Sequence, residues 1–385
     1  MRHSTPRLIT AAAVTAAALL FTACTPAGSS TATDAADGAP GTGGTAIGFI
    51  MVGPRDDYGY NQAVYEASQT LADEYPELEI LTAENVPEDD SAATTMEQMI
   101  DRGAKIIFAT SYGHLDAAQA VAAEHPDVVV VQQGNTIPDG EVLPNDGTYF
   151  GTVYEPMYLA GIAAGAATTS GKLGYVYAFP IPQTIANINA FERGAQTVRP
   201  DVQTIAVATS SWCDPAAQRD AATSLLSQGV DVLTQHQDCT KTVIDAAEAA
   251  GAYTVGYHAD ASSLAPDGWL TGAVWDWAPL YNAIVKTVLA GDFTGSGYNG
   301  NYRVGFKTGT NPFVLAGFGP TVSDQTKAEI ATAQEWLATP QGSPFAGPVA
   351  TQDGTVVAEP GTVPTYAEID GMDYFVQGVV GNLAQ

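Results

Sequence analysis

Aromatic and polar side chains that could hold a flat, polar molecule occur together at the ends of predicted strands. The aromatic ones are Tyr60, Tyr112, Trp212, Tyr257 and Trp275, and the polar ones interleaved with them are Asn61, Ser111, His236, Asp238 and Asp260. An aromatic ring stacks on a planar heterocycle with a gain of roughly 1–3 kcal/mol for each base, while amide, hydroxyl and carboxylate groups read its edge. Each aromatic taken singly is more often a core or rim residue. Five at one edge favour a binding site, and the mixture fits a nucleobase.

Catalytic chemistry has less support in the sequence. Asp57, Asp238 and Asp260 could form the paired carboxylates of a glycosidase, but acids are abundant in this chain and such pairs arise by chance. The five histidines are scattered, and the chain contains no HExxH, CxxC or GxSxG motif. The one GxGxxG match, residues 295–300, does not open a helix after a strand and is predicted to be a loop. We therefore expect no metal, no cofactor and no catalytic residue.

The elements that must position these side chains are clearest in residues 224–262. A helical ending runs into Gly229, and the apolar strand after it stops in the polar sequence QHQD at 235–238. A second helix ends at Gly251, and the next strand, from Tyr253, also ends in polar residues. Ligands of open α/β sheets bind outside the carboxyl ends of the strands. Polar groups gathered there indicate a binding edge.

An internal repeat predicts the architecture. Gly48 and Gly174, Gly103 and Gly229, and Asn61 and Asn187 are each 126 residues apart, and the strands around them correspond. The pattern predicts an α/β protein with two doubly wound, Rossmann-like lobes. The alternative to common descent of the two halves is that any two doubly wound segments show the same order of helix, glycine and strand. That alternative also leaves two lobes.

Several local features are predicted in the first lobe and at the passage out of it. Asn61 is expected at or near the N-cap of a helix that runs from about residue 62 to residue 75, as an alternative to ligand contact. The Ala/Gly-rich helix 156–167 is expected to pack closely on a sheet, and the chain first passes between lobes there.

In the second lobe, Pro180 and Pro182 are expected to hold Phe179 in a fixed place. Asp214 is a predicted N-cap with Pro215 at the first helical position. A hairpin is expected around Gly309, and the C-terminal tail is expected to cross between the lobes a third time.

The N-terminus reads as an export signal and not as part of the fold. Arg2 and Arg7 precede an apolar stretch that ends at Phe21, and the segment is too short for a membrane span. Its end resembles the lipobox of bacterial lipoproteins, which makes Cys24 the lipidated new N-terminus. The alternative is an ordinary cleaved signal with a chance cysteine. Residues 25–44 are Ser, Thr, Ala, Gly, Asp and Pro, a composition typical of a flexible tether.

The two remaining cysteines are predicted to pair, and the net charge limits the kind of partner. Cys213 and Cys239 each follow a predicted strand end, and we expect a disulfide between them on adjacent strands, against the alternative of two free thiols. The 385 residues carry a net charge of −28. Such a surface repels phosphate backbones, which excludes nucleic acid as the expected partner.

Seven segments together carry a family resemblance. They are GYNQ (59–62), ATSYGH (109–114), AGIAAG (160–165), GYVYAFPIPQTIANINAF (174–191), SSWCDP (210–215), DVLTQHQD (231–238) and GYHADAS (256–262). The sequence resembles the basic membrane lipoproteins, substrate-binding proteins of ABC importers related to purine-nucleoside receptors (PnrA-like). The resemblance covers most of residues 45–385. It implies the type I periplasmic-binding fold with a three-stranded hinge, three passages between lobes, and ligand capture by hinge closure.

The resemblance also implies contacts and partners. Carried over position by position, the contacts fall on Tyr60, Asn61, Ser111, Tyr112, Trp212, His236, Asp238, Tyr257 and Asp260. The family commonly has an acid for ribose where this chain has His258, which argues against a nucleoside and leaves a free purine base or another flat, amide-rich ring as the expected ligand. The implied partners are a permease, an ATPase and, through the lipid, the outer face of the cell membrane, with the receptor itself a monomer. A ligand sensor for a signalling partner and a nucleoside-processing surface enzyme are the alternatives.

The expected domain division follows from both lines of reasoning. Residues 1–23 are the signal peptide and 24–44 the lipid-anchored tether. Lobe 1 is expected to comprise residues 45–153 with about 277–308, and lobe 2 residues 154–276 with about 309–385.

Overall fold

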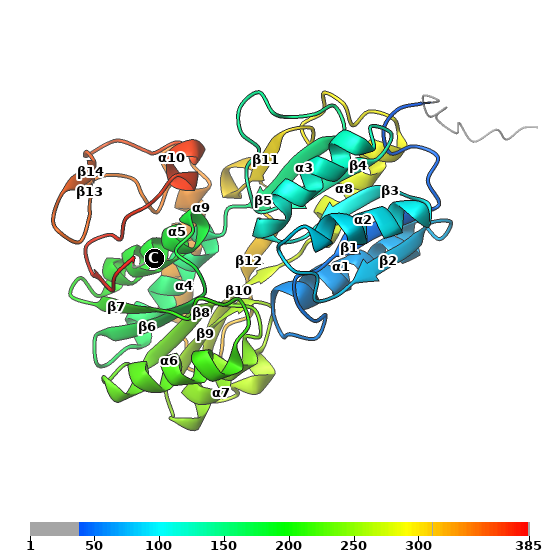
Figure 1. The fold of residues 1–385 in the computed structure, drawn as a ribbon. Helices are drawn as coiled ribbons and strands as arrows, with labels where there is room; N and C mark the ends of the chain where they lie inside the picture. The colour runs from blue at the N-terminus through cyan, green and yellow to red at the C-terminus, as the bar shows by residue number, and fades with distance from the viewer. Residues whose placement is uncertain (1–37, 310, 384–385) are drawn as a thin grey trace, which may run out of the picture. The chain divides into compact units, whose positions relative to one another are not determined.

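The computed structural model describes residues 38–309 and 311–383. The predicted signal peptide, the lipidation site Cys24 and most of the tether therefore lie outside the described residues. Within them the chain builds two large sheets, each covered by helices on both faces (Figure 1). This confirms the predicted α/β class with two doubly wound halves.

The first sheet has six strands in the order β11-β5-β4-β3-β1-β2, and every neighbouring pair is parallel. The strands are β1 (Ala46–Ile50), β2 (Glu79–Ala83), β3 (Ala104–Ala109), β4 (Val129–Gln133), β5 (Asp146–Gly151) and β11 (Asn301–Val304). The central strands are continuous apolar runs because both faces are buried. We call this sheet and its helices lobe 1.

Alternating residues of these strands face two helical layers. Ile47 and Phe49 of β1 join the core beneath α1 (Tyr60–Glu74) and α8 (Ala278–Leu289). Ala46 and Ile50 join the core beneath α2 (Ser91–Asp101) and α3 (Leu115–Glu124). The period of two along a strand thus sets which helix each side chain meets.

The second sheet has seven strands in the order β12-β10-β9-β8-β6-β7-β15. They are β6 (Lys172–Tyr177), β7 (Gln203–Ala208), β8 (Val232–His236), β9 (Tyr253–His258), β10 (Trp269–Trp275), β12 (Phe313–Leu315) and β15 (Val379–Val380). Only β12 runs antiparallel to its neighbour in this sheet. Helices α4 (Tyr154–Ala167) and α5 (Pro182–Val198) cover one face, and α6 (Pro215–Ser227) and α7 (Lys241–Ala249) cover the other. We call this sheet and its helices lobe 2.

The chain passes between the sheets three times. Residues between β5 and α4 make the first passage, and those between β10 and α8 make the second. Residues 305–309 and 311–312, between β11 and β12, belong to the third. The predicted hairpin around Gly309 is wrong, because β11 pairs with β5 of lobe 1 and β12 with β10 of lobe 2.

The C-terminal tail also differs from the expectation that it would make the third crossing. After α9 (Asp324–Leu337), a small antiparallel pair, β13 (Val349–Ala350) with β14 (Val356–Ala358), and α10 (Tyr366–Asp370), its strand β15 pairs with β7 of lobe 2. The tail contacts lobe 1 where Asp370 lies 3.7 Å from Arg303 of β11. The third crossing was misplaced because a two-residue strand leaves almost no pattern in the sequence.

Helix α4 covers the sheet of lobe 2, as predicted, and its closest packing is against helix α5. A Cβ at Gly161 of α4 would fall on the carbonyl oxygen of Phe191 in α5, and one at Gly194 of α5 would fall on that of Tyr158 in α4. The glycines thus let two backbones touch. Twelve of the fourteen residues of α4 are buried as a result.

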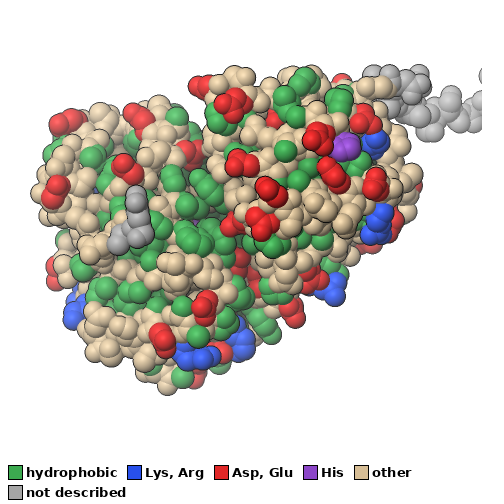
Figure 2. All heavy atoms as spheres, in the orientation of Figure 1, with side chains coloured by type: hydrophobic (Ala, Val, Ile, Leu, Met, Phe, Trp, Pro, Cys, Tyr) green, Lys and Arg blue, Asp and Glu red, His purple; other side chains and the backbone are tan. Residues whose placement is uncertain are grey.

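The surface is strongly acidic, as the composition requires. Acidic side chains are spread over the visible face, and basic ones are few (Figure 2). No helix in the described part of the chain is long and apolar enough to span a membrane.

Candidate ligand-binding site

A small cavity lies among the carboxyl ends of the strands of both lobes. It is lined by Val52, Tyr60, Ser111, Tyr112, Gly134 and Phe150 of lobe 1 and by Gln183, Trp212, His236, Asp238 and His258 of lobe 2. Its volume is about 30 Å³, room for about two water molecules. Six residues predicted as ligand contacts are among its walls: Tyr60, Ser111, Tyr112, Trp212, His236 and Asp238.

Two other predicted contacts lie behind this wall. Asn61 is fully buried, and its Nδ2 donates to Asp57 Oδ2 at 2.8 Å and to Asp238 Oδ2 at 3.3 Å. Asn61 is not the N-cap of α1. The N-cap residue is Gly59, two residues before Asn61, and the Asp57 carboxylate accepts from the backbone N–H groups of Gly59, Asn61 and Gln62. Tyr257 is also buried, with its ring 4.6 Å from that of His236.

The last two predicted contacts do not line the cavity either. Asp260 is exposed and accepts a hydrogen bond from the Ser262 amide at 2.9 Å, so it closes a surface turn. Trp275 is buried, and its indole Nε1 donates to His258 Nδ1 at 2.9 Å. Strand-end position placed both residues at the carboxyl edge of the sheet, but it did not show which side chains line the cavity.

Five lining residues were not predicted as contacts. Val52, Gly134 and Phe150 lie at or just beyond the ends of β1, β4 and β5, so the strand-end rule could have found them. Gln183 opens α5 after the proline-bounded loop. His258 was noted only as a departure from the family pattern.

The two acids nearest the cavity share one amide. Both are buried, and Asn61 Nδ2 lies between Asp57 of lobe 1 and Asp238 of lobe 2. Burial raises the pKa of Asp238 well above its usual range, and the Asp57 charge raises it further. Burial also raises the pKa of Asp57. Raised pKa values favour the neutral form of a carboxyl group, which can both donate and accept a hydrogen bond.

Both histidines of the site are neutral near pH 7. Burial lowers the pKa of His236 to about 3. Burial, followed by the neighbouring His236, lowers the pKa of His258 well below its usual value. Each ring therefore offers one N–H donor and one nitrogen acceptor, and neither offers a positive charge.

Glu88, which the sequence did not single out, joins the two lobes beside the cavity. It lies in the loop after β2. Its Oε1 accepts from Ser111 Oγ at 2.6 Å and from the Gly113 amide at 2.9 Å. Its Oε2 accepts from Trp212 Nε1 at 3.3 Å. Trp212 also contacts Phe179, the residue predicted to be held in place by the two prolines that follow it, with ring centroids 5.2 Å apart.

The predicted disulfide between Cys213 and Cys239 is present, with the two Cα atoms 5.3 Å apart. The two cysteines were expected to follow adjacent strands. They follow β7 and β8, and β6 lies between these two strands. The loops after these strands reach across β6, and the Asp238 amide donates to the Trp212 carbonyl at 2.8 Å. Two cavity residues are therefore neighbours of the bonded cysteines, and the crosslink holds their loops together.

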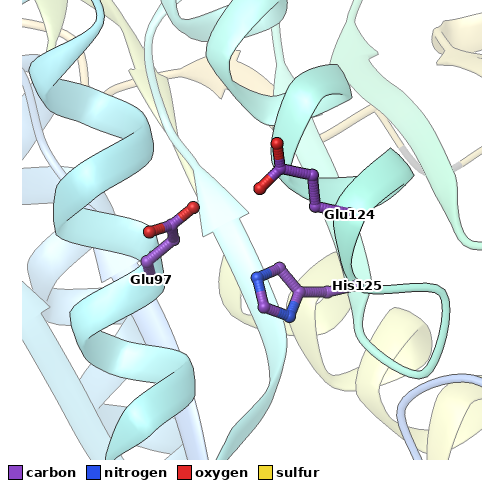
Figure 3. A group of neighbouring side chains, drawn as sticks. All are labelled: Glu97, Glu124 and His125. Atoms are coloured by element: carbon purple, nitrogen blue, oxygen red, sulfur yellow. The ribbon is translucent and has the colours of Figure 1, made fainter.

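One further cluster could in principle attract a cation. Glu97 of α2 and Glu124 and His125 at the end of α3 bring their ligand atoms within 4.8 Å of one another (Figure 3). The two carboxylates are exposed, and exposed acids often lie close together without an ion. We assign no metal to this group.

Comparisons with known proteins agree with this geometry. The family model described as ABC transporter substrate-binding protein PnrA-like (Bmp) matches residues 45–330. A purine-binding protein of Brucella abortus is 32% identical over 345 residues, covering 88% of this chain and 94% of the relative. A putative ABC transporter glucose-binding protein of Haloferax volcanii is 32% identical over 311 residues, covering 80% and 76%.

Among solved structures, an ABC transporter solute-binding protein from Conexibacter woesei superposes with a TM-score of 0.63 at 22% identity, over 76% of this chain and 96% of that one. This likeness establishes the type I periplasmic-binding fold that the sequence resemblance implied. The family match covers most of the described chain and includes every residue of the cavity. The chain belongs to the PnrA-like (Bmp) family of ABC transporter substrate-binding proteins.

Proposed function

We propose that this substrate-binding protein closes on a purine base or nucleoside between its two lobes. The observation that carries the proposal is the composition of the cavity wall. Aromatic rings from both lobes, including Tyr112 and Trp212, surround a buried carboxyl group and two neutral imidazoles. Rings bind the faces of a planar heterocycle, and the polar atoms read its edge.

The known relatives support two ligand classes. One relative is named as purine-binding and another as glucose-binding, at the same identity to this chain. The purine is favoured because four aromatic side chains line the wall and can stack on the faces of a planar heterocycle: Tyr60, Tyr112, Phe150 and Trp212. A ligand N–H group that reaches the free oxygen of buried Asp238 would stabilise its ionised form, which burial otherwise disfavours.

The family fixes the coarser role. Its members are extracytoplasmic substrate-binding proteins of ABC transporters, which are not enzymes. They bind a small molecule and deliver it to a permease and its ATPase. Closure requires both lobes to contact the ligand, since only a higher affinity of the closed state shifts the population toward it.

Replacing Trp212 with alanine tests the stacking role. Loss of one base–ring stack, worth roughly 1–3 kcal/mol, should weaken purine binding about 5- to 150-fold in calorimetric titrations. Trp336→Ala removes the same side chain from α9, away from the cavity, and should leave the affinity unchanged. Equal affinity in wild type and Trp212→Ala would reject the stacking assignment.

Native mass spectrometry of the purified protein would show which ligand it carries, and glucose without purine would reject the proposed ligand.

We also propose that the mature protein is anchored through a lipid on Cys24 and that its lobes divide as the sequence predicts. The lipobox-like segment before Cys24 supports the anchor. In cells, Cys24→Ser should move the protein from the membrane fraction to the soluble or secreted fraction on immunoblots. The same distribution for Cys24→Ser and wild type would reject the anchor without touching the ligand proposal.

A further inference from the structure

The backbone at His258 is held in an unfavourable conformation that turns its ring toward the cavity. Its φ is +72°, a value that residues other than glycine rarely adopt. A hydrogen bond of 3.0 Å from the Ala259 amide to the Tyr257 carbonyl closes the three-residue turn around it. Such strain persists where the surroundings fix it, and it is concentrated at functional sites.

Trp275 fixes which nitrogen of His258 carries the proton. The indole N–H is a donor only, and it points at His258 Nδ1 from 2.9 Å with the two rings 18° from parallel. Nδ1 must therefore accept, and the neutral ring carries its proton on Nε2. Trp275 itself does not touch the cavity.

The protonated nitrogen faces a carboxyl oxygen across the cavity wall. His258 Nε2 lies 3.9 Å from Asp238 Oδ1, too far for a hydrogen bond. Neither atom has a hydrogen-bond partner among the described residues, whereas Asp238 Oδ2 is held by Asn61. The wall therefore presents an N–H donor beside a carboxyl oxygen that accepts when Asp238 is ionised.

We propose that Trp275 is a positioning residue that sets His258 as a fixed donor, and that the His258–Asp238 pair reads an adjacent acceptor and N–H donor on the ligand's edge. This inference rests on the proposed purine function. The amidine edge of an aminopurine and the lactam edge of an oxopurine both offer such a pair. A 9-methylpurine lacks this pair, because it has no exocyclic group and its methyl group removes the N9–H donor beside N3.

The fixed tautomer of His258 affects affinity only for a ligand whose hydrogen-bond donors and acceptors cannot exchange roles. A hydroxyl group both donates and accepts, so a sugar could satisfy His258 in either tautomer. A heterocycle edge has its donor and acceptor in fixed places. The Trp275 contact therefore selects among ring ligands and gives no selection among sugars.

The chain contains a matched control for this role. Trp277 is fully buried and stacks on Trp275, with centroids 4.0 Å apart, but its Nε1 has no partner in the described part of the chain. Trp275→Phe and Trp277→Phe remove the same atoms from neighbouring core positions. Only the first also removes the hydrogen bond to His258.

The experiment compares the affinities of 9-methyladenine, 9-methylhypoxanthine and 9-methylpurine by calorimetry in wild type and both variants. In wild type, 9-methyladenine or 9-methylhypoxanthine should bind at least about 10-fold more tightly than 9-methylpurine, the effect of one well-placed hydrogen bond. Trp275→Phe should reduce that ratio by about 10-fold, and Trp277→Phe should keep it. Nitrogen-15 NMR of the histidine rings should show His258 protonated on Nε2 in wild type and in Trp277→Phe, and in mixed tautomers in Trp275→Phe.

Three results would overturn the inference. Equal ratios in the two variants would show that Trp275 only fills space. A wild-type His258 protonated on Nδ1 would contradict the fixed tautomer, and this measurement needs no variant to fold. Wild type that binds glucose and no purine would overturn the proposed function and the inference with it, which distinguishes that failure from the other two.

Discussion

Gly194→Ala is expected to lower the free energy of unfolding by about 2 kcal/mol or more. The new methyl group would lie against the Tyr158 carbonyl oxygen, so α4 and α5 would have to separate. Overpacking of this kind costs about 1–3 kcal/mol or more, and a backbone oxygen cannot relieve it by changing rotamer. The gain from alanine in a helix is only about 1 kcal/mol, so the clash decides the sign. Urea unfolding followed by circular dichroism measures the change.

Gly297→Ala is the control for this prediction. Gly297 lies in the turn region between α8 and β11, and a Cβ there would meet nothing within 4 Å. It should unfold within about 0.5 kcal/mol of wild type. If Gly194→Ala were as stable as this control, the backbone contact between α4 and α5 would not exist in solution.

Glu192→Gln is expected to flatten part of the pH dependence of stability. Glu192 of α5 is fully buried beneath the C-terminal strand and accepts hydrogen bonds of 2.7 Å from Thr204 and from Gln196. Burial raises its pKa from an ordinary value of 4.5 to about 7. Because the folded state holds the proton more tightly, the contribution is full below pH 4.5 and is lost as the pH rises through 7.

The expected size is about 3 kcal/mol, at about 1.4 kcal/mol for each pH unit between the two pKa values. Wild type should therefore lose more stability between pH 5 and 8 than Glu192→Gln does, as measured by urea unfolding at each pH. The raised pKa values of Asp57 and Asp238 act in the same direction and remain in the variant. Glu335→Gln, which removes one exposed charge from α9, should follow wild type. Parallel curves for wild type and Glu192→Gln would show that Glu192 is ionised throughout.

The sequence predicted much of the fold because its signals are local. Continuous apolar runs identify strands buried on both faces, as in β1 and β4, and glycines just after helices mark where the next strand begins. Asp214 and Pro215 begin α6 as predicted, since capping depends on the next few residues only. The C-terminal tail was misplaced because β15 has two residues and depends on a partner strand far away in the chain.

The site was predicted at the level of the sheet edge and less well at the level of side chains. Parallel strands end at one edge, so Ser111, Trp212 and His236 could be brought together from the order of elements alone. Whether a side chain enters the cavity or lies behind it depends on how the loops pack. Trp275 and Asn61 were therefore taken for ligand contacts, although they hold His258 and Asp238.

By itself, the sequence determined the two-lobed α/β class, the edge at which the site lies, the pairing of Cys213 with Cys239 and the family to which the chain belongs. Only the tertiary structure decided that Glu88 reaches Trp212 from the other lobe and that Trp275 sets the proton on His258. The physical reason is the separation along the chain of the residues that each kind of interaction joins. Strand, cap and turn preferences depend on neighbouring residues, whereas a hydrogen bond between residues 124 positions apart depends on the packed arrangement of every element between them.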